Sequence, residues 1–366
     1  MESIFQKSWL CRRLLLVYTV KTIAAVLVQL NQPLEIMELE IPLLKKGQVL
    51  VQLAYSGLCH SQINEWKGIK GPDAYLPHTL GHEGSGIVLE VGEGVTKVKA
   101  GDHVVLSWIK GTGLDIPVTL YRMGEKIVNS GAISTFLEKA VISENRLIRI
   151  DPKIPLKEAA LLGCAIPTGA GVIFNDMQVK EGQSISVFGV GGIGSSALLA
   201  ASHAKAYPIV AIDVHDEKLS LAKQLGASHT IHAGKENVLE KLVEISNGKG
   251  FDFSFESAGR REVMEIAFEC IKAGGCCVLA GNLPKGEKIQ IDPFELIKGK
   301  KIMGTWGGGV QIDRDIPRFA DIFFQDQKTL QMLISHEVCL PEINQLMSAL
   351  GKGQVARGLI SFINNS

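Results

Sequence analysis

The chain lacks the long apolar runs of a membrane protein and the charge excess of a protein that binds polyanions. No stretch approaches the roughly 20 apolar residues that a helix needs to span a bilayer. Lysine and arginine together number 38, as do aspartate and glutamate, so the formal net charge is zero. A membrane-spanning protein is therefore not expected, and nothing favours nucleic acid or an anionic membrane as a partner.

Cysteine is scarce and scattered. The seven cysteines are an odd number and are widely spaced apart from one adjacent pair: Cys11, Cys59, Cys164, Cys270, Cys276, Cys277 and Cys339. Secreted proteins held by disulfides usually carry an even number of cysteines in a compact framework. We therefore expect free thiols, a reducing compartment and a cytoplasmic location.

Core-forming residues and glycine are abundant. Apolar residues make up 46% of the chain and charged residues 21%, as in globular proteins. A length of 366 residues favours two domains over one. The 39 glycines predict many tight turns and, at one place, a loop that cradles phosphate.

The first 21 residues form a separate segment. Arg12 and Arg13 precede the apolar run LLLVYTV, and no small-residue cleavage site follows before Lys21. The run is at the lower limit for the core of a signal peptide. We interpret residues 1–21 as an extension ahead of the first strand, without a part in the chemistry.

Two sequence rhythms divide the rest of the chain. Residues 22–165 contain short β-branched or alternating runs, such as GQVLVQLAYS and DHVVLSW, which predict strands. From about residue 185, apolar strands alternate with helical segments, which predicts βαβ units around a parallel sheet. We expect an α/β protein with a β-rich domain over residues 22–165, completed by 310–366. A doubly wound Rossmann domain is expected over residues 166–309.

A dinucleotide motif lies in SVFGVGGIGSSALLAA, where Gly189, Gly191 and Gly194 follow an apolar strand and open a helix. In that setting the first glycine permits a tight turn, the second lets a pyrophosphate approach, and the third lets helix and strand pack closely. Asp213 ends the next strand, 19 residues after Gly194. There it would bind ribose hydroxyls and repel a 2′-phosphate, which favours NAD over NADP. The alternative is a glycine turn without a ligand.

A second candidate site begins in the stretch GLCHSQINEWKG, where Cys59 and His60 follow a predicted strand. A buried cysteine beside a surface histidine would explain the pair, as would half of a disulfide or a chance juxtaposition. The remaining explanation is that Cys59 binds a metal together with ligands further along the chain.

Candidate partner ligands do occur downstream. His82 and Glu83 lie between two glycines, and Cys164 lies just before the dinucleotide domain. Together with Cys59, one imidazole and a second thiolate would give a zinc ion three protein ligands and leave a fourth position open for catalysis. Spacing alone does not select these residues over three other candidates: His60, His78 and Cys339.

Taken together, the chain resembles the zinc-dependent medium-chain alcohol dehydrogenases from about residue 22 onward. The most specific element is GHEGSGIVLEVGEGV, residues 81–95, which fits the family's zinc signature without a mismatch. GLCHS, GVGGIG and VARGLISF also occur in the family's order. The resemblance implies a GroES-like catalytic domain beside the Rossmann domain. It also implies NAD as cofactor and a catalytic zinc held by Cys59, His82 and Cys164, because alcohol dehydrogenases use a Cys₂His zinc site.

The resemblance further implies roles for single residues. Glu83 would lie next to the metal, as an alternative ligand or as a partner of the ligands. Ser61 would pass on the substrate proton, and Trp108 would line the substrate pocket. The cofactor would be contacted at its phosphates or ribose by His60, Gly192, Lys218 and Arg357, and near its nicotinamide by Thr168 and Ile193.

Three departures from the family pattern affect these expectations. Members with a second, structural zinc carry four closely spaced cysteines after the strand that ends at Trp108, and none occurs there in this chain. We therefore expect one zinc per chain. Asn64 stands where the proton relay often ends in a histidine, so the relay would use Ser61 with a ribose hydroxyl, or His60. Gln62 replaces an acid that often orients the ligand histidine, and it supplies no charge.

The two sites together predict a zinc-dependent oxidoreductase that transfers a hydride between a primary or secondary alcohol and NAD. Alternatives are a polyol or sugar dehydrogenase, whose members usually have glutamate where Cys164 stands, and a zinc-free enone or quinone reductase. A nucleotide-binding sensor without turnover is a further alternative. We expect a small-molecule substrate and a homo-oligomer, dimer or tetramer, formed through the sheet edge near CCVLAG and KIMGTW.

Overall fold

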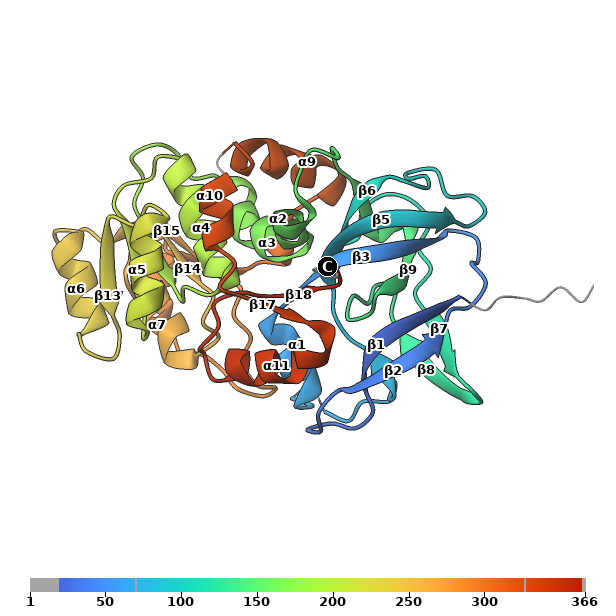
Figure 1. Ribbon diagram of the computed structural model, residues 1–366. Coiled ribbons are helices and arrows are strands. Elements are labelled where there is room, and N and C mark those ends of the chain that lie inside the picture. Colours follow the sequence, from blue (N-terminus) through green and yellow to red (C-terminus); the bar gives the residue numbers. More distant parts are fainter. Residues whose placement is uncertain (1–19, 70, 326, 364–366) are drawn as a thin grey trace, which may run out of the picture.

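The computed structural model describes residues 20–69, 71–325 and 327–363. Figure 1 shows two lobes side by side, a β-rich lobe on the right and an α/β lobe on the left. The predicted N-terminal extension lies outside the described residues except for its last two, so its role stays a prediction.

Part of the β-rich lobe is a barrel that is closed, within the described residues, in the order β1-β2-β7-β8-β4. Its strands are β1 (Lys21–Leu27), β2 (Glu35–Glu40), β4 (His78–Thr79), β7 (Thr119–Met123) and β8 (Lys126–Ser130). Along β7, Thr119 and Tyr121 are buried while Leu120 and Arg122 are exposed. This period of two is expected where one face of a strand packs on a core. The hairpin β7–β8 lies in the cysteine-free segment that follows Trp108 in the sequence.

A second sheet of the same lobe runs in the order β10-β6-β5-β3-β18-β17, with β9 paired to β3. Its strands are β3 (Gln48–Leu58), β5 (Glu83–Val91), β6 (His103–Ser107), β9 (Lys139–Ser143), β10 (Leu147–Arg149), β17 (His336–Cys339) and β18 (Gly358–Ser361). β18 pairs antiparallel with β3, so that Gly358 lies opposite Leu58. Strands from late in the chain therefore complete the β-rich lobe. The numerical domain boundaries near residues 165 and 309 stay predictions.

The α/β lobe contains a parallel sheet in the order β13-β12-β11-β14-β15-β16. Its strands are β11 (Ile185–Phe188), β12 (Ile209–Asp213), β13 (His229–His232), β14 (Phe251–Glu256), β15 (Ile271–Leu279) and β16 (Lys301–Gly304). Its helices are α4 (Gly192–His203), α5 (Asp216–Gln224), α6 (Val238–Ile245), α7 (Arg261–Glu269) and α8 (Pro293–Ile297). α7 buries Met264, Ala267 and Phe268, the spacing of one helix face. The strand order reverses between β11 and β14, as in a Rossmann fold.

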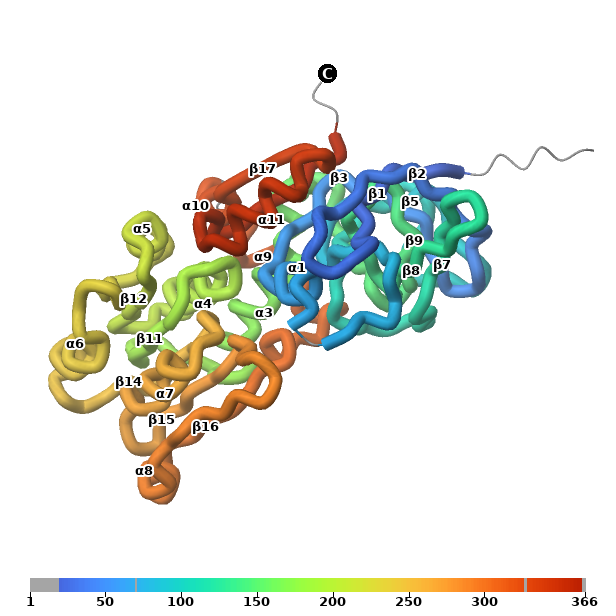
Figure 2. The backbone as a smooth tube through the Cα atoms, turned by 90° about the horizontal axis from the view of Figure 1, so that it is seen from below, coloured from blue at the N-terminus to red at the C-terminus, as the bar shows by residue number. Residues whose placement is uncertain are grey.

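The remaining helical segments lie mainly at the junction of the lobes and along the C-terminal part (Figures 1 and 2). They are α1 (His60–Trp66), α2 (Leu156–Ala159), α3 (Ala165–Gly171), α9 (Ile312–Phe323), α10 (Gln327–Met332) and α11 (Ile343–Gly351). Shorter turns are the 3₁₀ segments η1 (Glu144–Arg146), η2 (Ala160–Gly163), η4 (Gly307–Gly309) and η5 (Leu340–Glu342), and the π-helical turn η3 (Val172–Asp176).

One hydrophobic cluster crosses the junction of the lobes. It joins Val105 of β6, Ile166 of α3, Val187 of β11 and Phe319 of α9. Because α3 is packed within this shared core, the residues at its start are held in a defined place between the two lobes.

A search for membrane-spanning helices among the described residues finds no single helix of sufficient length and apolarity. One helical pair, Leu156–Gly163 with Ala165–Asp176, passes by length and composition only, and it is bent by 56°.

Candidate metal centre and cofactor site

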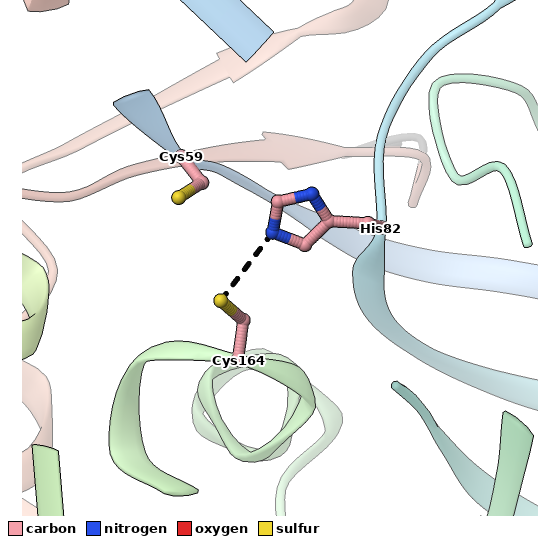
Figure 3. Close-up of side chains that lie close together, drawn as sticks. All are labelled: Cys59, His82 and Cys164. Atoms are coloured by element: carbon pink, nitrogen blue, oxygen red, sulfur yellow. Dashed lines mark hydrogen bonds between the residues drawn. The ribbon is translucent and has the colours of Figure 1, made fainter. Parts of the chain in front are cut away.

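Three side chains that are remote in the sequence converge at the junction of the lobes (Figure 3). Cys59 follows the end of β3, His82 directly precedes β5, and Cys164 directly precedes α3. Their ligand atoms all lie within 4.8 Å of one another, and His82 Nε2 is 3.3 Å from Cys164 Sγ. Two sulfurs and one imidazole nitrogen at this separation fit a tetrahedral zinc ion with one position left open.

The two cysteines differ in acidity. Their mutual hydrogen bond lowers the pKa of Cys59 well below its ordinary value, and His82 lowers it further against the opposing effect of burial. The same hydrogen bond, together with burial, raises the pKa of Cys164. One sulfur is thus favoured as a thiolate, the form in which cysteine binds a metal. The chemistry of the donor set therefore fits a cation.

Gln62 contacts the candidate ligand His82, as its position in the sequence suggested. This residue is buried in α1, and its side-chain amide contacts Nδ1 of His82. Its Oε1 accepts a hydrogen bond of 2.9 Å from the backbone N–H of Cys59. One amide thus links two of the three candidate ligands and turns Nε2 of His82 toward the sulfurs, the usual task of a group behind a metal-bound histidine.

Glu83 and Arg357 form a buried ion pair beside the metal cluster. Their side chains are 0% and 4% exposed, and Arg357 Nη2 donates a hydrogen bond to Glu83 Oε1. Burial lowers the pKa of the guanidinium, and the negative charge of Cys59 raises it in opposition. A Cβ atom on Gly192 would lie 3.2 Å from Arg357 Nη1. Arg357 therefore lies between the cluster and the start of α4, which is the dinucleotide loop.

The dinucleotide loop has the backbone that the glycine motif predicts. Gly189 follows β11 with φ +89°, and a Cβ atom on Gly194 would collide with the Gly189 carbonyl oxygen. Around Gly191 no atom lies within 4 Å of a Cβ position, which leaves room for a ligand to approach. Asp213 Oδ2 at the end of β12 accepts a 2.7 Å hydrogen bond from Val190 N. The acid is thereby tied to the loop.

Two buried polar atoms near the cluster, Ser61 Oγ and Glu83 Oε2, have no hydrogen-bond partner within the described residues. Native proteins seldom leave such atoms unpaired, and their grouping fits a site whose ligands supply the partners.

The other predicted cofactor and pocket residues lie nearby. Desolvation lowers the pKa of His60 in α1; Cys59 opposes this, and the positive charges of Lys67 and Lys218 add to it. The positive charge of Lys218 in α5 thus reaches His60 in α1. Ile193 in the first turn of α4 packs on the shared core. The ring of Trp108 lies 6.4 Å from the ring of His82 in an edge-on arrangement.

Two of the other metal-ligand candidates that spacing left open, one histidine and one cysteine, lie outside the cluster. His78 is in the barrel, where its Nε2 is 2.8 Å from Asp73 Oδ2. Cys339 is exposed at the end of β17. The sequence did not predict that Trp306 belongs near this site, because it pointed to this residue only as part of an oligomer edge. The centroid of its ring lies 5.1 Å from that of Trp108. Its one sequence signal is the run of three glycines that follows it.

A Rossmann lobe with a glycine-rich loop, next to a Cys₂His cluster in a GroES-like lobe, defines a class: two-domain zinc-dependent dehydrogenases. Family profiles agree with this. The profile of the alcohol dehydrogenase GroES-like domain matches residues 45–152, and that of the zinc-binding dehydrogenases matches residues 192–325.

Individual proteins are similar over nearly the whole chain. The S-(hydroxymethyl)glutathione dehydrogenase of Synechocystis is 34% identical, covering 93% of this chain and 100% of that protein. The protein of the same name from Haemophilus influenzae is 32% identical, covering 94% and 98%. Among solved structures, benzyl alcohol dehydrogenase from Acinetobacter calcoaceticus has a TM-score of 0.84 at 27% identity, covering 94% of this chain and 100% of that one.

The chain belongs to the zinc-dependent medium-chain dehydrogenase family. It is an oxidoreductase of the alcohol dehydrogenase type, and zinc and NAD are the cofactors of such enzymes.

Proposed function

We propose that Cys59, His82 and Cys164 hold one catalytic zinc ion per chain and that the enzyme interconverts primary or secondary alcohols with their aldehydes or ketones. The observation that carries the proposal is the convergence of three ligand atoms within 4.8 Å beside the dinucleotide loop. When bound, zinc supplies a Lewis acid that lowers the pKa of a hydroxyl or polarises a carbonyl. Glu83 supports the site as an alternative ligand or as a neighbour of the ligands.

The protein's own groups handle the proton and orient the reactants. Ser61 Oγ, which is buried and unpaired, accepts the proton of the substrate hydroxyl. Asn64 does not titrate near neutral pH, so the proton leaves through a ribose hydroxyl or through His60, the neighbour of Ser61 at the start of α1. Thr168 and Ile193 would hold the nicotinamide ring, and such positioning converts binding into orientation.

The cofactor that we propose for this site is NAD rather than NADP. Gly191 and Gly192 let the diphosphate approach the start of α4, where backbone N–H groups favour negative charge. Lys218 and Arg357 add positive charge from either side. Asp213 binds the ribose hydroxyls and disfavours a 2′-phosphate by charge repulsion.

The substrate class has more than one candidate. The similarity to proteins named S-(hydroxymethyl)glutathione dehydrogenase favours S-(hydroxymethyl)glutathione as a substrate. The similarity to benzyl alcohol dehydrogenase favours an aromatic alcohol. A polyol is disfavoured because Cys164 stands at the third ligand position. A zinc-free reductase would not need the three ligands, and a sensor would not need the unpaired Ser61 hydroxyl.

The test combines metal analysis with NAD reduction on benzyl alcohol, 1-propanol, a polyol and S-(hydroxymethyl)glutathione. We expect about one zinc per wild-type chain and reduction of NAD. In Cys164→Ser, zinc is lost and kcat/KM falls by about 100-fold or more, while NADH binding, followed by fluorescence, is retained.

Cys339→Ser is the matched control, because this exposed cysteine lies outside the cluster. It should keep both zinc and activity. Full activity in a metal-free preparation would refute the zinc assignment. Zinc and NADH binding without oxidation of any alcohol would favour a sensor instead.

We also propose a homo-oligomer, a dimer or tetramer, assembled through the edge strand β16, and a cytoplasmic location. The support for the first is apolar exposure beside that edge, where Phe294 and Ile297 of α8 are 56% and 78% exposed. The support for the second is the set of free thiols described above.

A further inference from the structure

We propose that Trp306 determines substrate specificity by forming, with Trp108, an aromatic wall beside the metal centre that selects alcohols carrying a flat ring. This inference rests on the proposed function and goes beyond it in naming the feature of the substrate that is recognised.

The aromatic rings form a continuous series that leads outward from the metal ligands. Trp108 lies edge-on to His82, with ring centroids 6.4 Å apart and planes at 67°. Trp306 in turn lies edge-on to Trp108, at 5.1 Å and 78°. Trp306 is nevertheless 81% exposed, so most of its indole is free to receive another group. Trp108 thus offers an aromatic surface next to the candidate ligand His82, and Trp306 extends that surface outward, which suits an alcohol with a flat ring because aromatic groups pack favourably on one another.

The loop that carries Trp306 is held rigidly against the site. Gly307–Gly309 all have positive φ, between +61° and +73°, so the chain turns in a way that side chains rarely allow. A Cβ on the first would lie 2.7 Å from Ile109 Cδ1, and one on the second 2.6 Å from the Thr168 carbonyl oxygen. Thr305 Oγ1 donates to Asp176 Oδ2 and accepts from the N–H of the second glycine. The indole is thus presented by a fixed turn that packs beside Trp108 and the nicotinamide residue Thr168.

A second copy of the chain is the competing occupant of this surface. Trp306 follows the edge strand β16, which we propose as an interface. Its indole, however, contacts that of Trp108, which in turn lies against the candidate ligand His82. We therefore assign it to the substrate, and the oligomeric mass enters the test as the discriminating measurement.

The experiment measures kcat/KM of the zinc-loaded enzyme for benzyl alcohol and for 1-propanol, together with mass by light scattering. In Trp306→Ala, the ratio of benzyl alcohol to 1-propanol should fall about tenfold, mainly through KM for benzyl alcohol. In Trp306→Phe, which keeps a flat ring, the ratio should fall by less than about threefold. Tyr207→Ala is the matched control: this exposed aromatic lies before β12, at the amino end of the sheet, and its removal should leave the ratio unchanged.

An equal loss with both alcohols, an unchanged ratio in Trp306→Ala, or a change in oligomeric mass would each overturn the inference. If Trp306→Ala fails to fold, Trp306→Phe and Trp306→Leu are compared, and equal ratios in the two would overturn it. If the wild type oxidises alcohols and the variants keep its ratio, only this inference is wrong. If the wild type oxidises neither alcohol, the proposed function is wrong as well.

Discussion

At the scale of single residues, the ion pair Glu83–Arg357 lies between the candidate metal cluster and the dinucleotide loop. Its carboxylate and guanidinium are almost fully buried between the metal cluster and the start of α4. Each charge on its own would be costly in this low-dielectric setting, and the pair offsets that cost only while both members are present. The same arginine is our proposed contact for the cofactor diphosphate, so the pair would link the candidate metal cluster with the proposed cofactor site.

Removal of one member of this pair should therefore destabilise the protein strongly. In Glu83→Gln, the buried guanidinium loses its carboxylate partner and keeps only the negative charge of Cys59 nearby, and we expect the free energy of unfolding to fall by about 3 kcal/mol. Urea unfolding of the zinc-loaded protein measures this.

The double variant Glu83→Gln/Arg357→Met is the control, because it buries neither charge. It should recover much of the lost stability and still bind NADH more weakly than wild type. A single variant as stable as the wild type would contradict this account of the pair.

At the scale of elements, a hydrogen-bond network holds the segment after Trp108. Glu144 accepts hydrogen bonds from the backbone N–H groups of Thr96, Lys97 and Leu114, at 2.6, 3.0 and 2.8 Å. The segment itself contains no cysteine. A buried carboxylate fixes its start through several charge-assisted hydrogen bonds.

This network makes a pH-dependent contribution to stability. Burial alone would raise the pKa of the Glu144 carboxyl, but the hydrogen bonds from Leu114, Thr96 and Lys97 outweigh it and lower the pKa below 4.5. A lowered pKa in the folded state stabilises the protein above the unfolded value, and that stabilisation is lost as pH falls through the folded value. Glu144→Gln should cost about 2 kcal/mol of unfolding free energy at pH 7 and progressively less below about pH 4.5.

The matched control is Glu93→Gln, on an exposed turn next to the same segment, which should change stability by less than about 0.5 kcal/mol. Thermal and urea unfolding between about pH 2.5 and pH 7 measure both variants, so that the range covers the folded pKa of Glu144 as well as the unfolded one. A constant difference between Glu144→Gln and wild type across that range would contradict the assignment of the effect to the carboxylate.

At the scale of the whole molecule, the α/β lobe has one open edge that is apolar. β16 pairs only with β15 within the described residues, and Met303 on it is 40% exposed. The adjacent helix α8 has no buried residue. Exposed sheet edges are sites where a second chain adds on, and a two-fold axis would bring two such edges together.

We therefore expect light scattering to give a dimer or tetramer for the wild type at micromolar concentration. The variant Ile297→Asp/Met303→Lys should lower the mass, because it places charge in the apolar surface. Leu43→Asp, a change at an 86% exposed residue of the β-rich lobe, should leave the mass unchanged. A monomeric wild type would contradict the proposed homo-oligomer.

Much of this protein follows from its local sequence. The glycines of the dinucleotide loop are required by the turn itself, since Gly189 has positive φ and Gly194 has no room for a Cβ. The alternation of strands and helices from residue 185 likewise follows from which side chains share a face of an element. Such features depend on neighbours a few residues apart, so the pattern alone predicts them.

Only the tertiary structure decided which remote residues meet. Spacing left the ligand set open, and resemblance rather than local pattern selected Cys59, His82 and Cys164. The pairing of Glu83 with Arg357, 274 residues later, and the contact of Trp306 with Trp108 were not foreseen. These contacts depend on strand register and on the packing of α3 between the lobes, which arise from the whole chain acting together rather than from any short segment of it.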